Sequence, residues 1–394
     1  MNKRKTISIG MIGYKFMGKA HSNAYRQAPF FFKLNAHPIL HTISGRREED
    51  VKVAARELGW SAFQTDWRRL IEDDEIDLID IASPNNTHAE MAIAALEAGK
   101  HVICEKPLAL NLEEAIRMKE AADKAGKVNM IMHNYRFAPA VQYAKELITN
   151  GKLGKIRHIR ATYLNESLID PNREFRWRLN KAVSGSGALG DIGSHIIDLS
   201  RFLVGEFSQV TGMMETFIEE RPLEGTSPSE KQMGIVDVDD MTAFLARFEN
   251  GAVGVFETSR MASGNKNGNR FEINGEKGSI RWDLENMNNL QIYLNDDPAG
   301  LKGFRTINCT DAMHPYAKNY WPAGHIIGYE HTFINLVHDL LCGIADGANP
   351  KPNFEDGVKN QAVLEAVERS TKEGTWVKIS DLLEKNSKKR RGLK

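Results

Sequence analysis

Three side chains could together act on a hydroxyl group: Lys106, Asp191 and His195. Lys106 follows the apolar run His101–Cys104, so we expect it at the carboxyl end of a strand, where an ammonium group can hydrogen-bond a ligand hydroxyl. Asp191 and His195 are four residues apart in a predicted helix and would share one face. Imidazole exchanges protons near neutral pH, and a nearby carboxylate can orient it. Spacing alone still favours the plainer alternative, in which Asp191 caps the helix and His195 packs beneath a sheet.

A glycine-rich turn near the start of the chain could bind the phosphates of a dinucleotide. The run Thr6–Ile12 predicts a strand, and the segment after the turn predicts a helix whose free amide groups would face an anion. The spacing departs from the G-x-G-x-x-G fingerprint, because Lys15 stands where the central glycine is expected. The pattern alone therefore also fits a tight turn in another α/β fold. The cofactor contacts predicted from this turn are Gly13, Tyr14, Lys15, Phe16, Met17 and Gly18.

The next two predicted strands end in polar residues at the edge where a cofactor would extend. The candidates there are Ser44, Gly45, Arg46, Ser83, Asn85, Asn86 and His88. An acidic residue after the second strand would select NAD, but no carboxylate precedes Glu48. Arg46 could pair with the 2′-phosphate of NADP or simply begin the next helix. After the third strand, turn formation and helix capping explain the polar residues as well as cofactor binding does, and we expect His88 to pack or cap.

Strand and helix patterns alternate through the first part of the chain. Apolar runs predict strands at Thr6–Ile12, Pro38–Ser44, Ile76–Ala82, His101–Cys104 and Val128–Met132. Helical segments lie between these runs, and strands joined by crossover helices form a parallel, doubly wound sheet. We therefore predict a Rossmann domain of the α/β class over residues 1–133 that binds a dinucleotide.

The pattern changes after residue 133. From Gln209 onward, period-two apolar segments alternate with turns such as Glu249–Gly251 and Gly275–Gly278, which predicts antiparallel hairpins. We predict a second, α+β domain over residues 134–380, with a large, mostly antiparallel open sheet that contributes to substrate binding and to subunit association. A last helix near residues 354–372 could pack back toward the first domain, and residues 381–394 form a basic, solvated tail.

Composition excludes several classes of function. The chain has 394 residues with 52 basic and 52 acidic side chains, and this zero formal net charge argues against a nucleic-acid-binding protein. No apolar run approaches the roughly 18 residues that a membrane-spanning helix needs. Cys104, Cys309 and Cys342 are widely spaced, which fits a reducing cytoplasm and neither a disulfide framework nor a zinc site. The histidines show no metal-ligand spacing, so we predict no metal.

Several motifs arrive in a specific order. They are Gly13 to Gly18 with Lys19-Ala20-His21, Ser83 to His88, Glu105-Lys106-Pro107, Asp191 to His195, and Glu355-Asp356-Gly357. Together they resemble the Gfo/Idh/MocA family, the relatives of glucose–fructose oxidoreductase and inositol dehydrogenase, over nearly the whole chain. The resemblance implies an NAD(P)-dependent enzyme, a cis bond before Pro107, and a catalytic set of Lys106, Asp191 and His195.

Further site residues follow from this assignment. Glu105, Lys106, Asn134 and Arg136 join the predicted cofactor contacts, and the predicted substrate contacts are Lys106, Tyr135, Asn165, Trp177, Arg178, Asp191, His195 and His325. Aromatic rings stack on the C–H faces of sugars, while Arg, Asn and His bind hydroxyls, although a surface or core role explains each of these residues about as well.

We therefore predict an oxidoreductase that acts on a secondary hydroxyl group of a sugar, anhydrosugar or cyclitol, with NAD or NADP as cofactor. The charge of Arg46 favours NADP and the family resemblance favours NAD, so we expect weak discrimination between the two cofactors. One alternative is a redox-neutral glycosidase of the same fold that uses bound nicotinamide transiently. A second is a nucleotide-sensing subunit without catalysis, against which the joint presence of Lys106, Asp191 and His195 argues. The predicted partners are the small-molecule substrate and further copies of the chain, as a homodimer or homotetramer.

Overall fold

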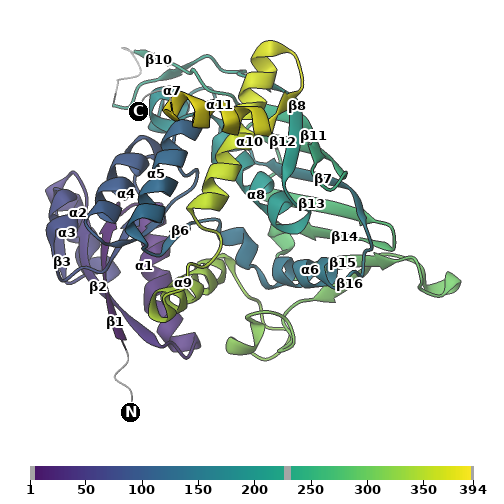
Figure 1. Ribbon diagram of the computed structural model, residues 1–394, viewed down its shortest axis with the longest axis horizontal. Coiled ribbons are helices and arrows are strands. Elements are labelled where there is room, and N and C mark those ends of the chain that lie inside the picture. The colour runs from purple at the N-terminus through teal and green to yellow at the C-terminus, as the bar shows by residue number, and fades with distance from the viewer. Residues whose placement is uncertain (1–4, 226–231, 392–394) are drawn as a thin grey trace. The chain divides into compact units, whose positions relative to one another are not determined.

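The computed structural model describes residues 5–225 and 232–391, with side chains as far as residue 386. The chain forms two compact units (Figure 1). Unit 1 takes residues up to 109, 113–137 and 327–358, and unit 2 takes residues 110–112, 138–326 and those from 359 onward. The predicted boundary at residue 133 placed residues 327–358 in the second domain. They belong with unit 1 because α9, Tyr329–Asp346, packs on α1, Phe16–Phe31.

Unit 1 is a doubly wound sheet of six parallel strands in the order β3-β2-β1-β4-β5-β6. The strands are β1 Lys5–Ile12, β2 Ala36–Ser44, β3 Ala62–Gln64, β4 Leu78–Ile81, β5 His101–Cys104 and β6 Asn129–Ile131. The connecting helices are α2 Glu48–Leu58, α3 Arg68–Glu72, α4 His88–Glu97 and α5 Leu112–Ala125. The fold class is as predicted, except that β3 was missed. This strand has three residues and little burial, so no periodicity marks it, and pairing with the end of β2 defines it.

The central strands of unit 1 are buried on both faces, as expected for a parallel sheet covered on both sides. Ile9 and Met11 on β1, Ile79 on β4 and Val102 on β5 are all fully buried. This two-sided core fixes the strands, and with them the loops at their carboxyl ends.

Unit 2 is built on a nine-stranded mixed sheet in the order β16-β15-β14-β13-β7-β12-β11-β8-β17. The strands are β7 Ile156–Leu164, β8 Phe207–Glu215, β11 Met241–Phe248, β12 Val253–Ser259, β13 Gly268–Gly275, β14 Gly278–Asp283, β15 Asn289–Leu294, β16 Arg305–Asn308 and β17 Val377–Lys378. Within the described chain all neighbours pair antiparallel except β7 and β12, which are parallel. A separate two-stranded ribbon joins β9, Glu220–Pro222, to β10, Met233–Ile235.

Two helices, α6 Pro139–Thr149 and α8 Ser194–Leu203, pack on one face of this sheet. Strand register aligns Phe244, Phe256, Phe271 and Trp282 across that face, and all four side chains are buried. The large sheet therefore has an apolar inner face, and the alternate residues of each strand point to the outer face.

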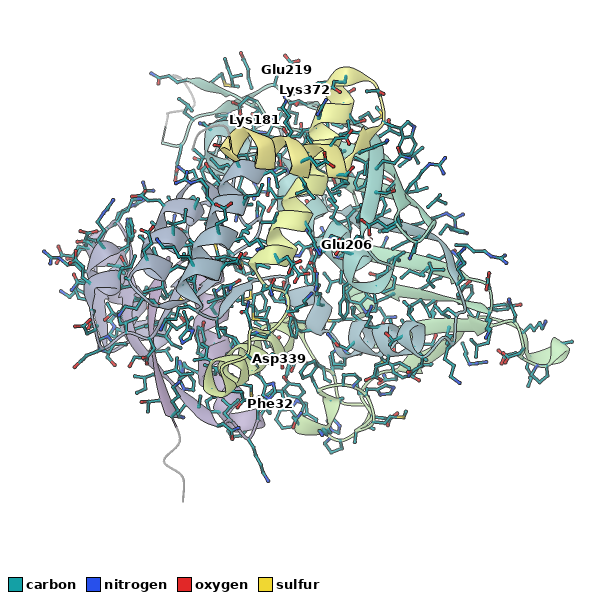
Figure 2. The ribbon with its side chains drawn as sticks, viewed as in Figure 1. Phe32, Lys181, Glu206, Glu219, Asp339 and Lys372 are labelled. Atoms are coloured by element: carbon teal, nitrogen blue, oxygen red, sulfur yellow. The ribbon has the colours of Figure 1, made fainter. Side chains whose placement is uncertain are left out.

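The carboxyl-terminal helices complete unit 2. Glu206 accepts a hydrogen bond from Arg201 Nε at 2.8 Å and lies 3.4 Å from Lys359 Nζ, which ties the end of α8 to α10, Phe354–Glu373 (Figure 2). The last helix, α11, runs from Ile379 to Arg391 and packs against β8. The solvated tail predicted from residue 381 is therefore helical to Arg391, because Leu382 is an apolar residue that becomes buried there. Residues 392–394 of the predicted tail lie outside the described residues. No helix in the described part of the chain is long and apolar enough to cross a membrane.

Candidate functional site

The two glycines of the turn in unit 1 let its backbone pack tightly against neighbouring backbone atoms. Gly13 has φ +113°, and a Cβ there would lie 2.4 Å from the carbonyl oxygen of Ala82. A Cβ on Gly18 would lie 2.3 Å from the carbonyl oxygen of Gly13. Helix α1 begins at Phe16, earlier than the sequence predicted, and the exposed Lys15 caps it without a side-chain hydrogen bond. A helix start with free amides, an exposed ammonium group and no acidic residue in its first turn fits a pyrophosphate.

The end of β2 shows how this turn meets the next strand. A Cβ on Gly45 would lie 2.1 Å from Tyr14 Cε1, so the tyrosine ring packs directly on the glycine backbone. The Tyr14 hydroxyl donates to Asp50 Oδ2 at 3.3 Å, and burial together with this carboxylate raises the pKa of Tyr14. Ser44 is buried, whereas Arg46 is exposed at the position expected to meet the adenosine ribose. The edge thus carries a cation where an NAD-selective site carries a carboxylate.

The loop after β4 is held by its own side chains. Ser83 Oγ lies 2.6 Å from Thr87 Oγ1, and Thr87 also donates to the carbonyl of Pro84 at 2.7 Å. Asn85 is buried at the start of a 3₁₀ turn, and Asn86 is exposed. Exposure leaves Asn86 accessible to a cofactor, while Ser83 is engaged in the turn.

His88 has a different position from the predicted cofactor contact. Its ring is fully buried, with Nδ1 3.0 Å from the carbonyl oxygen of Pro107 and Nε2 3.0 Å from that of Ser83. Burial lowers the pKa of His88. Because a neutral imidazole has one N–H, the ring donates to one of these two carbonyls and packs against the other, so it lies between the loops that follow β4 and β5. We assign His88 to positioning the two loops.

Glu105 and Lys106 follow β5 directly, and the Lys106–Pro107 peptide bond is cis, as the resemblance implied. Glu105 is buried, and its Oε2 accepts a hydrogen bond from the Lys106 amide at 3.0 Å. The Lys106 side chain is half-buried. A partly accessible ammonium group at the carboxyl end of a parallel strand is placed to bind a ligand oxygen.

The predicted contacts Asn134, Tyr135 and Arg136 lie in a buried 3₁₀ turn of unit 1. Asn134 Nδ2 donates to Thr332 Oγ1 at 2.8 Å, and Arg136 Nη2 lies 3.4 Å from Asp356 Oδ1. Both side chains therefore take part in the packing of unit 1. These contacts do not bear on the cofactor role predicted for the two residues.

In unit 2 the segment around Asp191 is not the regular helix that the sequence predicted. Residues Leu189–Gly193 form a π-helical turn, and α8 begins only at Ser194. The Asp191 carboxylate is 28% exposed and lies between two guanidinium groups, 3.7 Å from Arg178 Nε and 3.8 Å from Arg260 Nη1. π-turns occur frequently at functional sites, because they shift side chains out of helical register.

His195 lies in the first turn of α8 and is 7% exposed. Its ring centroid is 5.8 Å from that of Tyr163 on β7, so the imidazole packs on the inner face of the sheet. Asp191 and His195 are thus anchored by different elements: two arginines flank the carboxylate, and an aromatic ring supports the imidazole.

An aspartate that sequence reasoning missed holds the π-turn in place. Asp239 accepts hydrogen bonds from the amides of Gly187 at 2.7 Å and Leu189 at 2.8 Å. A Cβ on Gly187 would lie 1.8 Å from the Asp239 carbonyl oxygen, so only glycine permits this approach. The same carboxylate accepts from Thr242 Oγ1 at 2.8 Å. The glycine-rich composition was a usable signal for a close approach, but nothing in the sequence identified Asp239 as the partner.

The remaining predicted substrate residues differ in placement. Asn165 follows β7, and its backbone N–H donates to the carbonyl of Ser259, at the end of β12, at 2.9 Å. The Arg178 guanidinium lies 4.4 Å over the Trp177 ring, and the same arginine approaches Asp191. His325 is exposed in the loop between β16 and α9, with Nδ1 2.8 Å from the carbonyl of Pro322. No contact among the described side chains links it to Asp191 or His195. No three His, Cys, Asp or Glu side chains of the described residues gather as metal ligands.

Comparison with known proteins supports the pattern of motifs. Residues 7–133 match the family model of the oxidoreductase family, NAD-binding Rossmann fold, and residues 141–281 match the GFO/IDH/MocA C-terminal domain. Levoglucosan dehydrogenase of Pseudarthrobacter phenanthrenivorans is 42% identical over 388 residues, covering 96% of this chain and 99% of that protein.

Two solved structures are similar over 95% of this chain. The oxidoreductase domain protein from Kribbella flavida has 49% sequence identity, a TM-score of 0.92 and 99% of its own chain covered. The complex of levoglucosan dehydrogenase with NADH and levoglucosan has 44% identity, a TM-score of 0.91 and 100% of its chain covered. These matches confirm the family resemblance and the Rossmann fold that the sequence predicted.

Proposed function

Because the chain belongs to the Gfo/Idh/MocA family of oxidoreductases, we propose that it oxidises a secondary hydroxyl group of a sugar, anhydrosugar or cyclitol by hydride transfer to NAD. The observation that carries the proposal is the similarity to levoglucosan dehydrogenase along the whole chain. An anhydrosugar is therefore the first substrate class to test.

Each half of the chain supplies one part of this chemistry. The nicotinamide ring, when bound, supplies the hydride acceptor. The turn from Gly13 to Gly18 would hold the pyrophosphate, since its glycines leave the backbone open to a close approach. We assign the hydroxyl proton to His195 as general base and the stabilisation of the developing alkoxide to Lys106. Asp191 would orient substrate hydroxyls or stabilise the imidazolium, with the guanidinium groups of Arg178 and Arg260 beside it.

The test is a panel of sugars, anhydrosugars and cyclitols with NAD and with NADP, followed at the absorbance of reduced nicotinamide. Stoichiometric NADH formation from one of these compounds is expected. Release of an aglycone from a glycoside without net NADH would identify the redox-neutral glycosidase instead. Cofactor binding without turnover of any compound would favour the sensing subunit, and better turnover of aliphatic alcohols would contradict a carbohydrate substrate.

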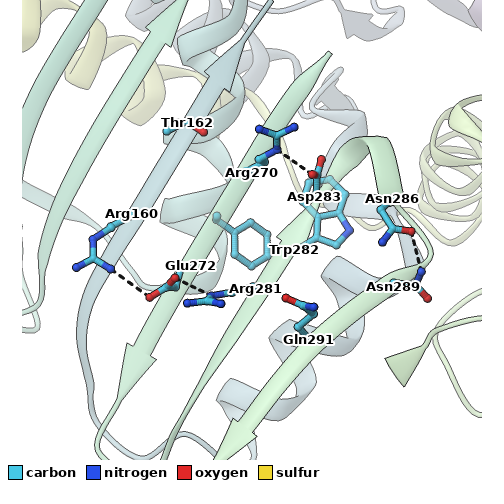
Figure 3. A pocket seen from close by; sticks show the side chains of 11 residues that line it. Arg160, Thr162, Arg270, Glu272, Arg281, Trp282, Asp283, Asn286, Asn289 and Gln291 are labelled. Atoms are coloured by element: carbon cyan, nitrogen blue, oxygen red, sulfur yellow. Dashed lines mark hydrogen bonds and ion pairs between the residues drawn. The ribbon is translucent and has the colours of Figure 1, made fainter. Parts of the chain in front are cut away.

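We further propose that the outer face of the large sheet joins two copies of the chain. Four apolar side chains there, the outer-face patch, are 44–52% exposed: Met213, Leu245, Val253 and Val255. Beside them Glu272 bridges Arg160 at 3.1 Å and Arg281 at 2.7 Å, in a shallow depression of about 410 Å³ (Figure 3). Apolar residues flanked by internally paired charges can face their own copy across a two-fold axis without like-charge repulsion.

Sedimentation equilibrium tests this association. Leu245→Glu is expected to lower the mass to that of one chain, because each two-fold contact would bury two carboxylates. Val53→Glu is the matched control, since Val53 is 42% exposed but lies on α2 of unit 1. A wild-type protein that sediments as a single chain, or an unchanged mass in Leu245→Glu, would contradict the proposed interface.

We also propose that the protein works in a reducing compartment such as the cytoplasm. All three cysteines are free thiols, as is usual where glutathione keeps proteins reduced. Equal activity with and without a thiol reductant during purification is expected, and dependence on an oxidant would contradict it.

A further inference from the structure

A cluster of buried charges lies beneath Lys106 in unit 1. His21 on α1 has Nδ1 2.9 Å from Asp80 Oδ1 on β4 and Nε2 3.0 Å from Glu105 Oε1 after β5. The three residues are at most 5% exposed. Tyr25, one turn after His21, donates its hydroxyl to Asp80 Oδ2 at 2.8 Å. One histidine thus connects three elements that are far apart in the sequence.

The geometry determines the protonation of this histidine. An ionised carboxylate only accepts hydrogen bonds, so a ring with a carboxylate at each nitrogen satisfies both as an imidazolium. Burial by itself would lower the pKa of His21, but Asp80 and Glu105 raise it to about 10. Burial would raise the pKa of Glu105, yet the hydrogen bond and charge of His21 lower it. Among the described residues, Lys106 also interacts with the cluster, and its charge helps to lower the pKa of Glu105. The buried His88 interacts with Glu105 as well, and burial lowers its pKa. Cys104 and Tyr329 face the cluster too, and burial raises their pKa values, so both stay neutral.

The cluster leads directly to the backbone of Lys106. Glu105 uses one oxygen for His21 and the other for the Lys106 amide, at 3.0 Å. On the far side of Lys106, the carbonyl of Pro107 lies 3.0 Å from His88 Nδ1. Two buried histidines therefore hold this backbone from either side, one through a carboxylate and one through a carbonyl.

We propose that His21 is a positioning residue, whose buried imidazolium fixes the Glu105 carboxylate and, through it, the direction of Lys106. Stability alone is a weak reason for such a cluster, because buried ion pairs are often no more stabilising than apolar side chains of similar size. A fixed cation next to Glu105 does hold a carboxylate oxygen on the Lys106 amide, which apolar packing cannot do. The inference rests on the proposed function for the role of Lys106 at the substrate.

The first experiment uses the wild-type protein and needs no turnover. Nitrogen-15 NMR of histidine-labelled protein at pH 8.5 should show a ring with both nitrogens protonated, and nuclear Overhauser contacts should place it beside Phe333, whose ring centroid is 5.7 Å from that of His21. Ordinary histidines are neutral at this pH. If the ring beside Phe333 is neutral at pH 8.5, the proposal is wrong.

The second experiment compares His21→Gln with Tyr25→Phe. Both side chains are fully buried and both bind Asp80, but only His21 reaches Glu105. Labelling of Lys106 by an amine reagent, followed by mass spectrometry, should become faster in His21→Gln and stay as in the wild type in Tyr25→Phe. A merely structural role would lower the melting temperature of both variants and leave Lys106 labelling equal in both.

Kinetics then separate the inference from the proposed function. On the best substrate, kcat should fall about tenfold or more in His21→Gln with little change in KM. The double variant His21→Gln/Lys106→Ala should be no slower than Lys106→Ala alone, because His21 acts through Lys106. Additive losses would overturn the proposal. If no sugar is turned over by the wild type, the proposed function fails, while the NMR and labelling results still decide the role of His21.

Discussion

In each unit polar groups lie at the carboxyl ends of parallel strands, but the two units hold these groups in different ways. In unit 1 the parallel strands β4 and β5 end at the loops of Ser83 and Glu105. In unit 2 the parallel pair β7 and β12 ends at Asn165 and at Ser259, and Arg260 follows beside Asp191. Carboxyl ends of parallel strands meet at one edge, which concentrates side chains there.

The difference lies in what fixes these edges. Unit 1 uses buried ionised groups, since His21 bridges Asp80 and Glu105 away from solvent. Unit 2 uses backbone amides, which Asp239 accepts, and leaves Asp191 28% exposed. The buried charge network keeps its groups away from solvent, whereas the segment held by Asp239 carries a partly exposed Asp191 and a buried His195. The first arrangement fits the proposed role of Lys106, and the second fits the proposed role of Asp191.

The largest effect is expected in unit 2, at His195. His195→Ala should lower kcat by about 10²-fold or more, with NAD still bound, because it removes the proposed base. His37→Ala is the control, since His37 is exposed on β2 and belongs to no predicted site, and it should keep kcat near the wild-type value. Steady-state kinetics over a range of pH checks both. Near-normal turnover of His195→Ala at every pH would remove His195 as the base.

The hydrogen bonds that Asp239 accepts from backbone amides should be essential to the π-turn. Asp239→Asn replaces an acceptor by an amide group that faces the N–H of Gly187 or Leu189, so we expect a loss of about 2–3 kcal/mol in the free energy of unfolding. Asp237→Asn is the matched control, because Asp237 accepts one exposed amide, that of Lys181. Urea denaturation measures both. Equal losses would mean that the π-turn does not depend on Asp239.

The buried charge of His21 should make the free energy of unfolding depend on pH. His21 has a folded pKa of about 10, above its ordinary 6.5, so its contribution to stability is complete below about pH 6.5 and is lost as pH rises toward 10. Between pH 7 and 8.5 the free energy of unfolding should fall by about 2 kcal/mol, at about 1.4 kcal/mol per pH unit. Cys104 and Tyr25 add to the loss only at higher pH, because their raised pKa values matter above the ordinary values of those groups.

His21→Gln provides the control for this slope. The variant should show a much flatter dependence of the free energy of unfolding on pH between 7 and 8.5, measured by urea denaturation at each pH. The same slope in both proteins would show that His21 does not carry the buried charge.

The smallest expected effect is on cofactor choice. The wild type should accept NAD and NADP within about two decades of kcat/KM, since Arg46 stands where NAD-selective sites carry a carboxylate. Arg46→Asp should shift the ratio toward NAD by about tenfold, or about 1.4 kcal/mol. Arg47→Asp is the control, because Arg47 already lies 3.7 Å from Asp50 and should change the ratio less. A wild-type preference beyond about 10⁴-fold would point to another determinant.

Much of unit 1 was predictable because its signals are local. The strand His101–Cys104 has the bounds that the sequence predicted. Apolar runs, helical periodicity and glycine turns each span a few residues and depend little on distant partners. The same holds for Glu105-Lys106-Pro107, whose place after a strand follows from its neighbours in the chain.

The candidate site was predictable in residue type and less so in geometry. A helix through Asp191 and His195 was the simplest interpretation of their spacing, but the π-turn changes their relation. Its cause lies in Asp239, whose contacts with Gly187 and Leu189 span about fifty positions of sequence. Periodicity carries no information about such a partner.

The sequence by itself determined five of the six strands in the first 133 residues, the glycine turn that suits a pyrophosphate, and the residue types available for proton transfer. These depend on backbone preferences and on neighbours within a turn or two. Tertiary structure decided the rest: that α9 packs on α1 in unit 1, that β7 pairs in parallel with β12, and that His21 lies between Asp80 and Glu105, 59 and 84 residues away. Such contacts arise only when folding brings distant segments together. Folding also removes the charges of His21, Asp80 and Glu105 from water. Their interaction, which would be weak in solvent, then becomes strong enough to keep His21 protonated.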